Sequence, residues 1–212
     1  MATVGGNNQP QYNGKLGRVV YYLLNGVLVA RGIGERTGPP SILELIGRMA
    51  TKVVCAFIKP LKPFINIGFE LEAKRNKSSP HNEAYTYLRR YALQGEYPDL
   101  EIDFSKVILT LGNMPLPPNP AVVLTDEGLR FTWEQQLEIF GAHWTDQVML
   151  AAYFPALRSA YYLTAGARRN QGIEYLPLGG IPKGNDVEIY FSFIADDRTR
   201  IATSIYMGRL TW

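Results

Sequence analysis

The chain of 212 residues is poor in the residues that several kinds of functional site require. A single cysteine, Cys55, excludes an internal disulfide and any zinc cage built from cysteines. Two histidines, His81 and His143, leave little material for a histidine-based catalytic dyad or triad. No glycine-rich phosphate loop is present, and no apolar run approaches the length of about 18 residues that a membrane-spanning helix needs. We therefore predict no enzymatic activity, no cofactor, no metal and no membrane span.

Charge is also scarce, and its two signs nearly cancel. Lysine and arginine exceed aspartate and glutamate by 22 − 19 = 3, while charged residues make up 19% of the chain and hydrophobic residues 46%. This balance is typical of a globular protein and not of a disordered one. The basic residues are scattered, so we predict no nucleic-acid partner. The first residues have neither the basic nor the apolar segment of a secretory signal, which predicts a cytoplasmic location, with signal-independent release or a virion-like assembly as alternatives.

What the sequence does contain is a clear hairpin near its start. Asn25-Gly26 is a preferred pair for a type I′ turn, and it lies between two β-prone runs, residues 18–24 and 27–31. The partners expected across that turn are Leu24 with Val27, Tyr22 with Val29, Val20 with Arg31, Leu23 with Leu28, and Tyr21 with Ala30. Both faces of this ribbon are largely apolar, whereas an exposed antiparallel ribbon normally keeps one face polar. We therefore expect both faces of the hairpin to be covered.

The rest of the first hundred residues is predicted to be mainly helical, because capping residues and apolar residues at helical spacing recur there. In order, we expect an extended arm up to Gly14, a glycine- and proline-rich link over residues 32–40, a helix from the cap Ser41 to a break at Pro60, further helix over residues 64–75, and a helix from the cap Ser79 to a stop at Gly95.

From about residue 100 onward the pattern is typical of short strands. The expected strands cover residues 102–111, 121–124, 129–133, 147–154, 160–164, 187–194 and 200–207. Some seven short strands with an early inward tryptophan, Trp133, predict an immunoglobulin-like or fibronectin-like sandwich, and the lack of a cysteine pair favours the fibronectin-like version. The predicted fold is therefore α+β, with an arm, hairpin and helical region in residues 1–99 and a β-sandwich in residues 100–212.

One candidate ligand loop lies within the predicted sandwich. His143-Trp144 falls between two strands, and Arg168-Arg169 follows another, so a binding module gripping a glycan or a protein is one interpretation. A hydrolase using His143 and Asp146 is a weaker interpretation, because such a short pairing is common by chance.

Several short motifs together resemble a family of unknown function from Bacteroidota, in which genomes often hold several paralogues. The matching motifs are Gly14-Lys-x-Gly17-x-Val-Val20, Gly26-x-x-Val29-x-Arg31, Lys59-Pro-x-x-Pro63-Phe64 with Gly68-Phe69, Gly95-Glu-Tyr-Pro98 with Ile102-Asp103, Phe131-x-Trp133, Tyr190-x-x-Phe193 and Ser204-x-Tyr206-x-Gly208. The chain departs from that family at Leu24-Asn25, where Trp-Lys is usual, and over residues 42–47, where an apolar stretch replaces a glutamine-rich one. The resemblance implies no reaction, cofactor or site.

These features favour a structural protein that associates with itself, as the subunit of a filament, sheath or particle. An apolar hairpin that is followed by a glycine- and proline-rich hinge can add its strands to the sheet edge of a second copy. The predicted assembly interface consists of Val20, Tyr21, Tyr22, Leu23, Leu24, Val27, Leu28 and Val29. The alternative is the monomeric binding module, with His143, Trp144, Arg168 and Arg169 in its ligand loops.

Overall fold

The computed structural model describes residues 3–5, 11–24, 27–35, 38–135 and 140–212. Within these residues the fold is α+β, as predicted, with three α-helices and antiparallel sheets. The chain divides into two compact units, Met1–Ser41 and Ile42–Trp212, and each is described by itself. The division that the sequence predicts lies elsewhere, after residue 99. None of the described helices is both long and apolar enough to cross a bilayer.

The first unit is a four-stranded antiparallel sheet, called here the N-terminal sheet. Its order is β1 (Thr3–Gly5), β2 (Gln11–Leu16), β3 (Val19–Leu24) and β4 (Val27–Gly32). The predicted register between β3 and β4 is confirmed at every pair, from Leu24 opposite Val27 to Val20 opposite Arg31. The turn residues Asn25 and Gly26 lie outside the described residues.

The extended arm predicted up to Gly14 is wrong for its described part, because that part forms strands. Gly14 lies opposite Tyr21, so β2 pairs with the side of β3 that the hairpin leaves open. The connection is a tight turn between Leu16 and Val19 in which Gly17 has φ +59°. Such a positive φ suits glycine, so Gly17 was the available signal for this second hairpin.

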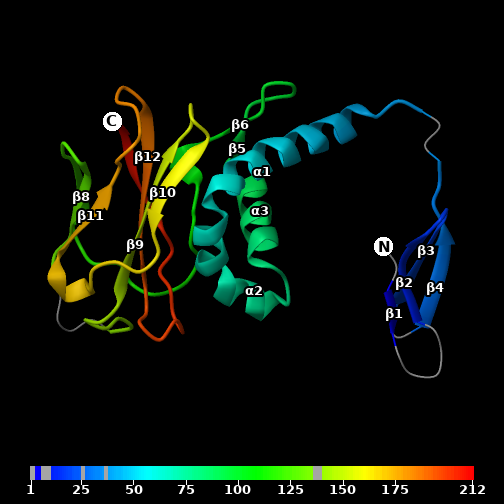
Figure 1. The fold of residues 1–212 in the computed structure, drawn as a ribbon, viewed down its shortest axis with the longest axis horizontal. Coiled ribbons are helices and arrows are strands. Elements are labelled where there is room, and N and C mark those ends of the chain that lie inside the picture. The colour runs from blue at the N-terminus through cyan, green and yellow to red at the C-terminus, as the bar shows by residue number, and fades with distance from the viewer. Residues whose placement is uncertain (1–2, 6–10, 25–26, 36–37, 136–139) are drawn as a thin grey trace. The chain divides into compact units, whose positions relative to one another are not determined.

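The second unit has three layers (Figure 1). Helices α1 (Ile42–Gly68), α2 (Glu70–Asn76) and α3 (Pro80–Tyr91) form the first layer. The middle layer is a sheet in the order β10 (Ser159–Leu163), β9 (Gln147–Phe154), β12 (Asp186–Ile194) and β13 (Ile205–Thr211). The third layer is a sheet in the order β11 (Ile173–Pro177), β8 (Gly128–Thr132) and β7 (Ala121–Leu124). A short ribbon of β5 (Leu93–Gln94) and β6 (Glu101–Ile102) connects the helices to the sheets.

The middle sheet is covered on both faces, and strand β12 shows why. Its alternate residues Val187, Ile189, Phe191 and Phe193 belong to the core between the two sheets. The intervening Tyr190 and Ile194 belong to a second core, shared with the helices. Because side chains of a strand point alternately to opposite faces, both sets must be buried for the three layers to hold together. The helices and the two sheets of this unit are therefore packed together through two cores, one on each face of the middle sheet.

The helix break predicted at Pro60 is wrong, because α1 continues through Pro60 and Pro63 to Gly68. A proline inside a helix removes a backbone hydrogen bond and costs about 3 kcal/mol. Burial compensates for that cost here. The apolar residues around the two prolines are at most 3% exposed, namely Phe57, Ile58, Leu61, Phe64 and Ile65. Tertiary packing thus overrides the local preference.

The third helix begins as predicted and ends earlier. The Ser79 Oγ accepts a hydrogen bond from the Asn82 backbone N–H at 3.2 Å, and Pro80 occupies the first turn. The helix stops at Tyr91 and not at Gly95, because Leu93 and Gln94 pair with β6 instead.

Three strand predictions also need correction. Of residues 102–111 only Ile102 is in a strand, and the backbone N–H of Leu109 donates instead to the Ser204 Oγ at 2.7 Å. The last strand runs over Ile205–Thr211, later than the predicted 200–207. The strand Ile173–Pro177 was not predicted, since its short run between Gly172 and a proline lacks a clear alternation.

We predict that Gly68→Ala lowers the free energy of unfolding by about 1–3 kcal/mol, because its backbone would have to move. A Cβ at Gly68 would collide with the Leu109 carbonyl oxygen. Gly47→Ala, in the same helix, is the control, since its Cβ would meet only the Arg89 Nη2, at 3.7 Å. Helix propensity should make that control neutral or stabilising by up to about 1 kcal/mol. Urea denaturation followed by circular dichroism measures both, and equal effects would contradict the tight packing.

Candidate functional site

The residues of the predicted assembly interface lie together on both faces of the N-terminal sheet. Leu23, Leu24, Val27 and Leu28 are between 43% and 65% exposed, and the other four are half-buried. The prediction that both faces are covered is not met within this unit, since its described residues after β4 form neither a helix nor a further strand. The sheet therefore presents large apolar side chains to its surroundings on both faces.

Strand β4 also leaves one row of its backbone groups without a strand partner in this sheet. The Ile33 N–H donates to the Arg18 carbonyl at 2.7 Å, which fixes the phase of hydrogen bonding between β3 and β4. In an antiparallel ladder bonded and non-bonded pairs alternate. Arg31 and Val29 therefore bond back to β3, while the N–H groups of Leu28 and Ala30 point to the open edge.

The net charge of the protein lies in this first unit. Residues 1–41 hold Lys15, Arg18, Arg31 and Arg36 against Glu35, so their net charge is 4 − 1 = +3. Residues 42–212 hold the remaining 22 − 4 = 18 basic and 19 − 1 = 18 acidic residues and are neutral.

A second candidate surface is the loop end, which we define by the described residues 133–135 and 140–146 of one loop, 164–172 of a second and 195–204 of a third. Hydrogen bonds tie these three loops to one another. The Arg200 guanidinium donates to the Gly141 carbonyl at 2.8 Å, and the Trp133 indole donates to the Arg169 carbonyl at 2.8 Å. Arg198 donates to the Thr164 carbonyl at 3.4 Å. The loops therefore form one supported surface.

Three of the four predicted ligand-loop residues meet on this surface. The Arg168 guanidinium lies 5.7 Å from the centre of the Trp144 ring, and the His143 ring centre lies 5.4 Å from that of Trp144. All three side chains are exposed. The His143 Nδ1 is 2.7 Å from the Thr145 hydroxyl, which orients the imidazole.

The fourth residue, Arg169, lies in the core and not on the surface. It is 1% exposed, its Nη2 donates to the Pro115 carbonyl at 2.8 Å, and its Nε lies 3.5 Å from the Asp146 Oδ2. Burial lowers the pKa of Arg169, and the carboxylate of Asp146 opposes that shift. The short helical turn at Arg169–Gln171 sends neighbouring arginines in opposite directions. Arg169 therefore supports the loops and cannot contact a ligand at their surface.

The pairing of His143 with Asp146 also differs from what a hydrolase needs. The Asp146 Oδ2 accepts a hydrogen bond from the backbone N–H of His143 at 2.7 Å, while the imidazole bonds to Thr145. The carboxylate thus holds the loop closed, and it does not orient the ring in this arrangement.

The acidic pair Asp196-Asp197 lies in a turn, where such residues commonly bond to the nearby backbone. The Asp197 carboxylate accepts from the Thr199 N–H at 3.0 Å and from its hydroxyl at 2.7 Å. In the described part of the chain no group of three or more histidine, cysteine, aspartate or glutamate side chains is placed to hold a metal ion.

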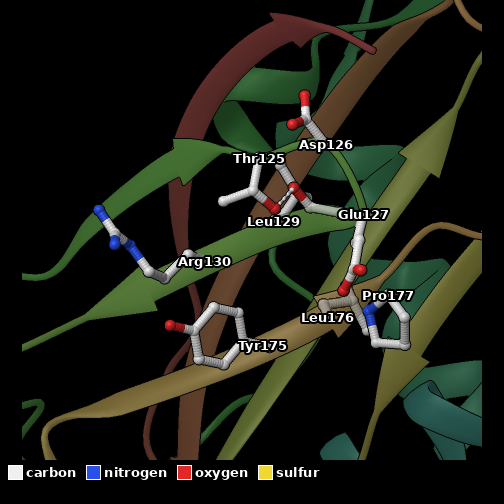
Figure 2. Close-up of a pocket in the computed structure, with 9 residues that line it drawn as sticks. Thr125, Asp126, Glu127, Leu129, Arg130, Tyr175, Leu176 and Pro177 are labelled. Atoms are coloured by element: carbon white, nitrogen blue, oxygen red, sulfur yellow. Dashed lines mark hydrogen bonds between the residues drawn. The ribbon is translucent and has the colours of Figure 1, made fainter.

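At the β7–β8 turn, a hollow of about 400 Å³ lies between that turn and β11 (Figure 2). Arg130 and Tyr175 are cross-strand neighbours on its outer wall, and Asp126 and Glu127 lie in the turn. The hollow is shaped by a close approach of backbones, because a Cβ at Gly128 would collide with the Leu176 carbonyl oxygen. Its charged groups are exposed and of both signs, so the hollow is a weaker candidate than the loop end.

The sequence did not point to one further polar cluster, around Glu188. This carboxylate is 0% exposed and accepts hydrogen bonds from the Tyr206 hydroxyl at 2.6 Å and the Arg209 Nε at 2.7 Å. Burial and the contact with Glu188 raise the pKa of Tyr206 to about 12. The alternation of β12 places Glu188 on the same face as Tyr190, which belongs to the core shared with the helices. The burial of Glu188 was not predicted from the sequence, because burial of both faces of β12 was not expected.

We predict that Arg169→Ala lowers the free energy of unfolding by about 3–5 kcal/mol, because Asp146 would stay buried without its counter-charge. Arg168→Ala is the matched control, since the adjacent side chain is exposed and should change stability by no more than about 0.5 kcal/mol. Chemical denaturation measures both. Similar losses in the two variants would contradict the supporting role of Arg169.

We predict that stability falls between about pH 10 and pH 12, partly through Tyr206. The ordinary pKa of 10.0 is raised to about 12 in the folded state, so the folded protein holds this proton more tightly than the unfolded chain. The stabilisation is fully present below pH 10 and is lost as the pH rises through the folded value. Tyr206→Phe should therefore show a shallower decline than the parent in urea titrations at a series of alkaline pH values. Tyr175→Phe makes the same chemical change at an exposed position. Parallel curves for the parent and Tyr206→Phe would contradict the assignment.

The chain was compared with known protein families, curated proteins and solved structures. A family model described as "Family of unknown function (DUF6266)" matches residues 12–208. No curated protein and no solved structure matches the chain.

Proposed function

Because the chain belongs to the DUF6266 family of unknown function, which assigns no activity, we propose a function from the geometry alone. We propose that the protein is a non-enzymatic structural subunit that associates with itself through the N-terminal sheet, in a filament, sheath or particle. The family resemblance seen in the sequence is confirmed, whereas its Bacteroidota origin and the cytoplasmic location stay predictions.

The observation that carries this proposal is the exposure of apolar side chains on both faces of a small sheet. A sheet gains most of its stability by burying at least one apolar face against another element. Leu24 and Val27 are 54% and 65% exposed on one face, and Leu23 and Leu28 are each 43% exposed on the other. Contiguous apolar surface of this kind is typical of sites that bind another protein. A second copy of the chain is present wherever the protein is made, so it is always available as such a partner.

The open edge of β4 supplies a second way to associate. Its outward N–H and C=O groups can pair with a strand of another molecule, and the strand carries none of the prolines or lysines that usually protect an edge. Addition that does not close on itself produces a fibre, and addition that closes produces a ring.

We also propose that β7 to β13 form an immunoglobulin-like or fibronectin-like sandwich. The strand orders β11-β8-β7 and β10-β9-β12-β13 support this, because seven antiparallel strands divide three and four between two facing sheets. The chain passes between the sheets after β8, β10 and β11, which suits such a sandwich. The buried Trp133, packed on Phe191 and Phe193, lies in the core between the sheets.

A second candidate function is a binding module whose loop end holds a glycan or a protein partner. The contact of Arg168 with Trp144 favours it, because exposed tryptophan and arginine on a supported surface are typical of binding sites.

We predict that Tyr22→Lys combined with Val29→Lys yields a folded protein of lower mass than the parent. The two side chains are direct cross-strand neighbours, so two lysines would place charge in the centre of one apolar face. Light scattering after size exclusion measures the mass, and circular dichroism checks the fold.

The matched control is Val123→Lys with Ile173→Lys on the three-stranded sheet. These side chains are 48% and 38% exposed, and their strands lie on either side of β8. The control should keep the mass of the parent. A parental mass that persists in the Tyr22 and Val29 variant, or a parent that is monomeric at all concentrations, would overturn the proposal. Ala30→Pro removes one outward N–H of β4. It should weaken association through strand pairing at this edge and leave association through the apolar faces unchanged.

A further inference from the structure

We propose that the loop end binds a sugar ring that carries a carboxylate, with Trp144 contacting the ring and Arg168 the acid group. This inference narrows the second candidate function and rests on it. It does not depend on self-association, which involves the other unit.

The first reason is that the loop end is supported from below. Within it, Asp146 and Arg169 are buried under the exposed side chains, and the Asp146 carboxylate accepts a hydrogen bond from the His143 backbone N–H. The Arg168 backbone N–H donates to the Gln171 Oε1 at 2.6 Å, and a β-bridge joins Arg168 to Gln147. A ligand would therefore meet side chains on an ordered backbone, which lowers the entropic cost of binding.

The second reason is the exposure of Trp144. The other two tryptophans are core residues, with Trp133 5% and Trp212 7% exposed and their indole groups bonded to backbone carbonyls. Trp144 is 40% exposed and belongs to neither hydrophobic core. Its flat apolar ring matches the C–H face of a pyranose, which needs an apolar contact without losing the hydration of its hydroxyl groups.

The third reason is the charge that accompanies this ring. Among the described residues Arg168 forms no ion pair with a carboxylate, whereas Arg169 next to it does. Its guanidinium lies beside the Trp144 ring and presents the fork of donors that matches a carboxylate. An acid group on the sugar would thus meet Arg168 while the ring contacts Trp144.

His143 can add a hydrogen bond to the contacts of Trp144 and Arg168. Because its Nδ1 is bonded to Thr145, its orientation is set, and Nε2 is the nitrogen left for another partner. The ring is close to that of Trp144, so Nε2 can serve a sugar hydroxyl near the stacked ring.

The overall charge argues for a single carboxylate and against a polyphosphate. Aromatic and arginine side chains also bind single-stranded nucleic acids, but those sites lie in strongly basic surroundings. The unit that carries the loop end has 18 basic and 18 acidic residues, as counted above, and so lacks such surroundings.

The test uses the full chain with three small probes, namely methyl glucuronide, methyl glucoside and uridine monophosphate. The first two differ only in a carboxylate against a hydroxymethyl group. Saturation-transfer NMR detects weak binding whatever the size of the protein, and calorimetry provides the affinity. We expect methyl glucuronide to bind in the millimolar range usual for a single ring, and methyl glucoside about tenfold more weakly.

Variants locate the binding. Trp144→Ala should abolish it, and Arg168→Gln should weaken methyl glucuronide about tenfold while leaving methyl glucoside unchanged. Tyr175→Ala and Arg130→Gln, an exposed aromatic and arginine pair on the three-stranded sheet, should change neither. Absence of binding, equal binding of the two glycosides, tighter binding of uridine monophosphate, or equal loss in the control variants would each overturn the proposal. A mass measurement on the same samples reports self-association separately, so failure of one proposal is distinguished from failure of the other.

Discussion

The three layers of the larger unit depend on one constraint, which is that strands β9 and β12 are buried on both faces. Every residue of β12 after Asp186 is buried, and so is every residue of β9 after Gln147. The odd-numbered residues of β12 pack in the core between the two sheets, and Tyr190 and Ile194 on its other face pack in the core shared with the helices. Two polar side chains that are buried in β12 are hydrogen-bonded, namely Ser192 to Thr110 at 2.7 Å and Glu188 to Arg209 at 2.7 Å. The core between the two sheets also supports the loop end, because the Arg169 guanidinium lies 4.6 Å from the centre of the Phe193 ring in β12.

Features set by neighbouring residues were predictable, and features set by distant contacts were not. The hairpin register followed from Asn25-Gly26 and a period of two, and the Ser79 cap followed from its position before Pro80. The helix break predicted at Pro60 was wrong because α1 is stabilised by burial against residues far along the chain. Residues 107–111 misled for a related reason, since Leu109 and Thr110 bond to Ser204, more than 90 positions away, instead of pairing in a strand. For the candidate site the sequence placed three of four ligand-loop residues together. It could not tell Arg168 from Arg169, because only the turn at residues 169–171 decides which arginine is buried.

The two units divide the physical tasks of the protein. The larger one is neutral and well packed, and it presents its one exposed tryptophan beside an arginine at the loop end. The smaller one holds the whole net charge and exposes apolar side chains on a thin sheet. A protein that assembles through the small unit and displays the loop end of the large one would join both candidate functions in one molecule. Several linked copies of a weak binding site would bind a multivalent ligand more tightly than one copy does.

If the N-terminal sheet is covered by a second copy, the mass of the unmodified protein in solution must exceed that of one chain. Light scattering after size exclusion over a range of concentrations, with negative-stain images of the same fractions, would make the measurement. We expect an oligomer or polymer whose mass is a multiple of 23.8 kDa and increases with concentration unless the assembly closes. A monomer of 23.8 kDa at every concentration would contradict it, since the exposed faces of β3 and β4 would then have no second copy to cover them.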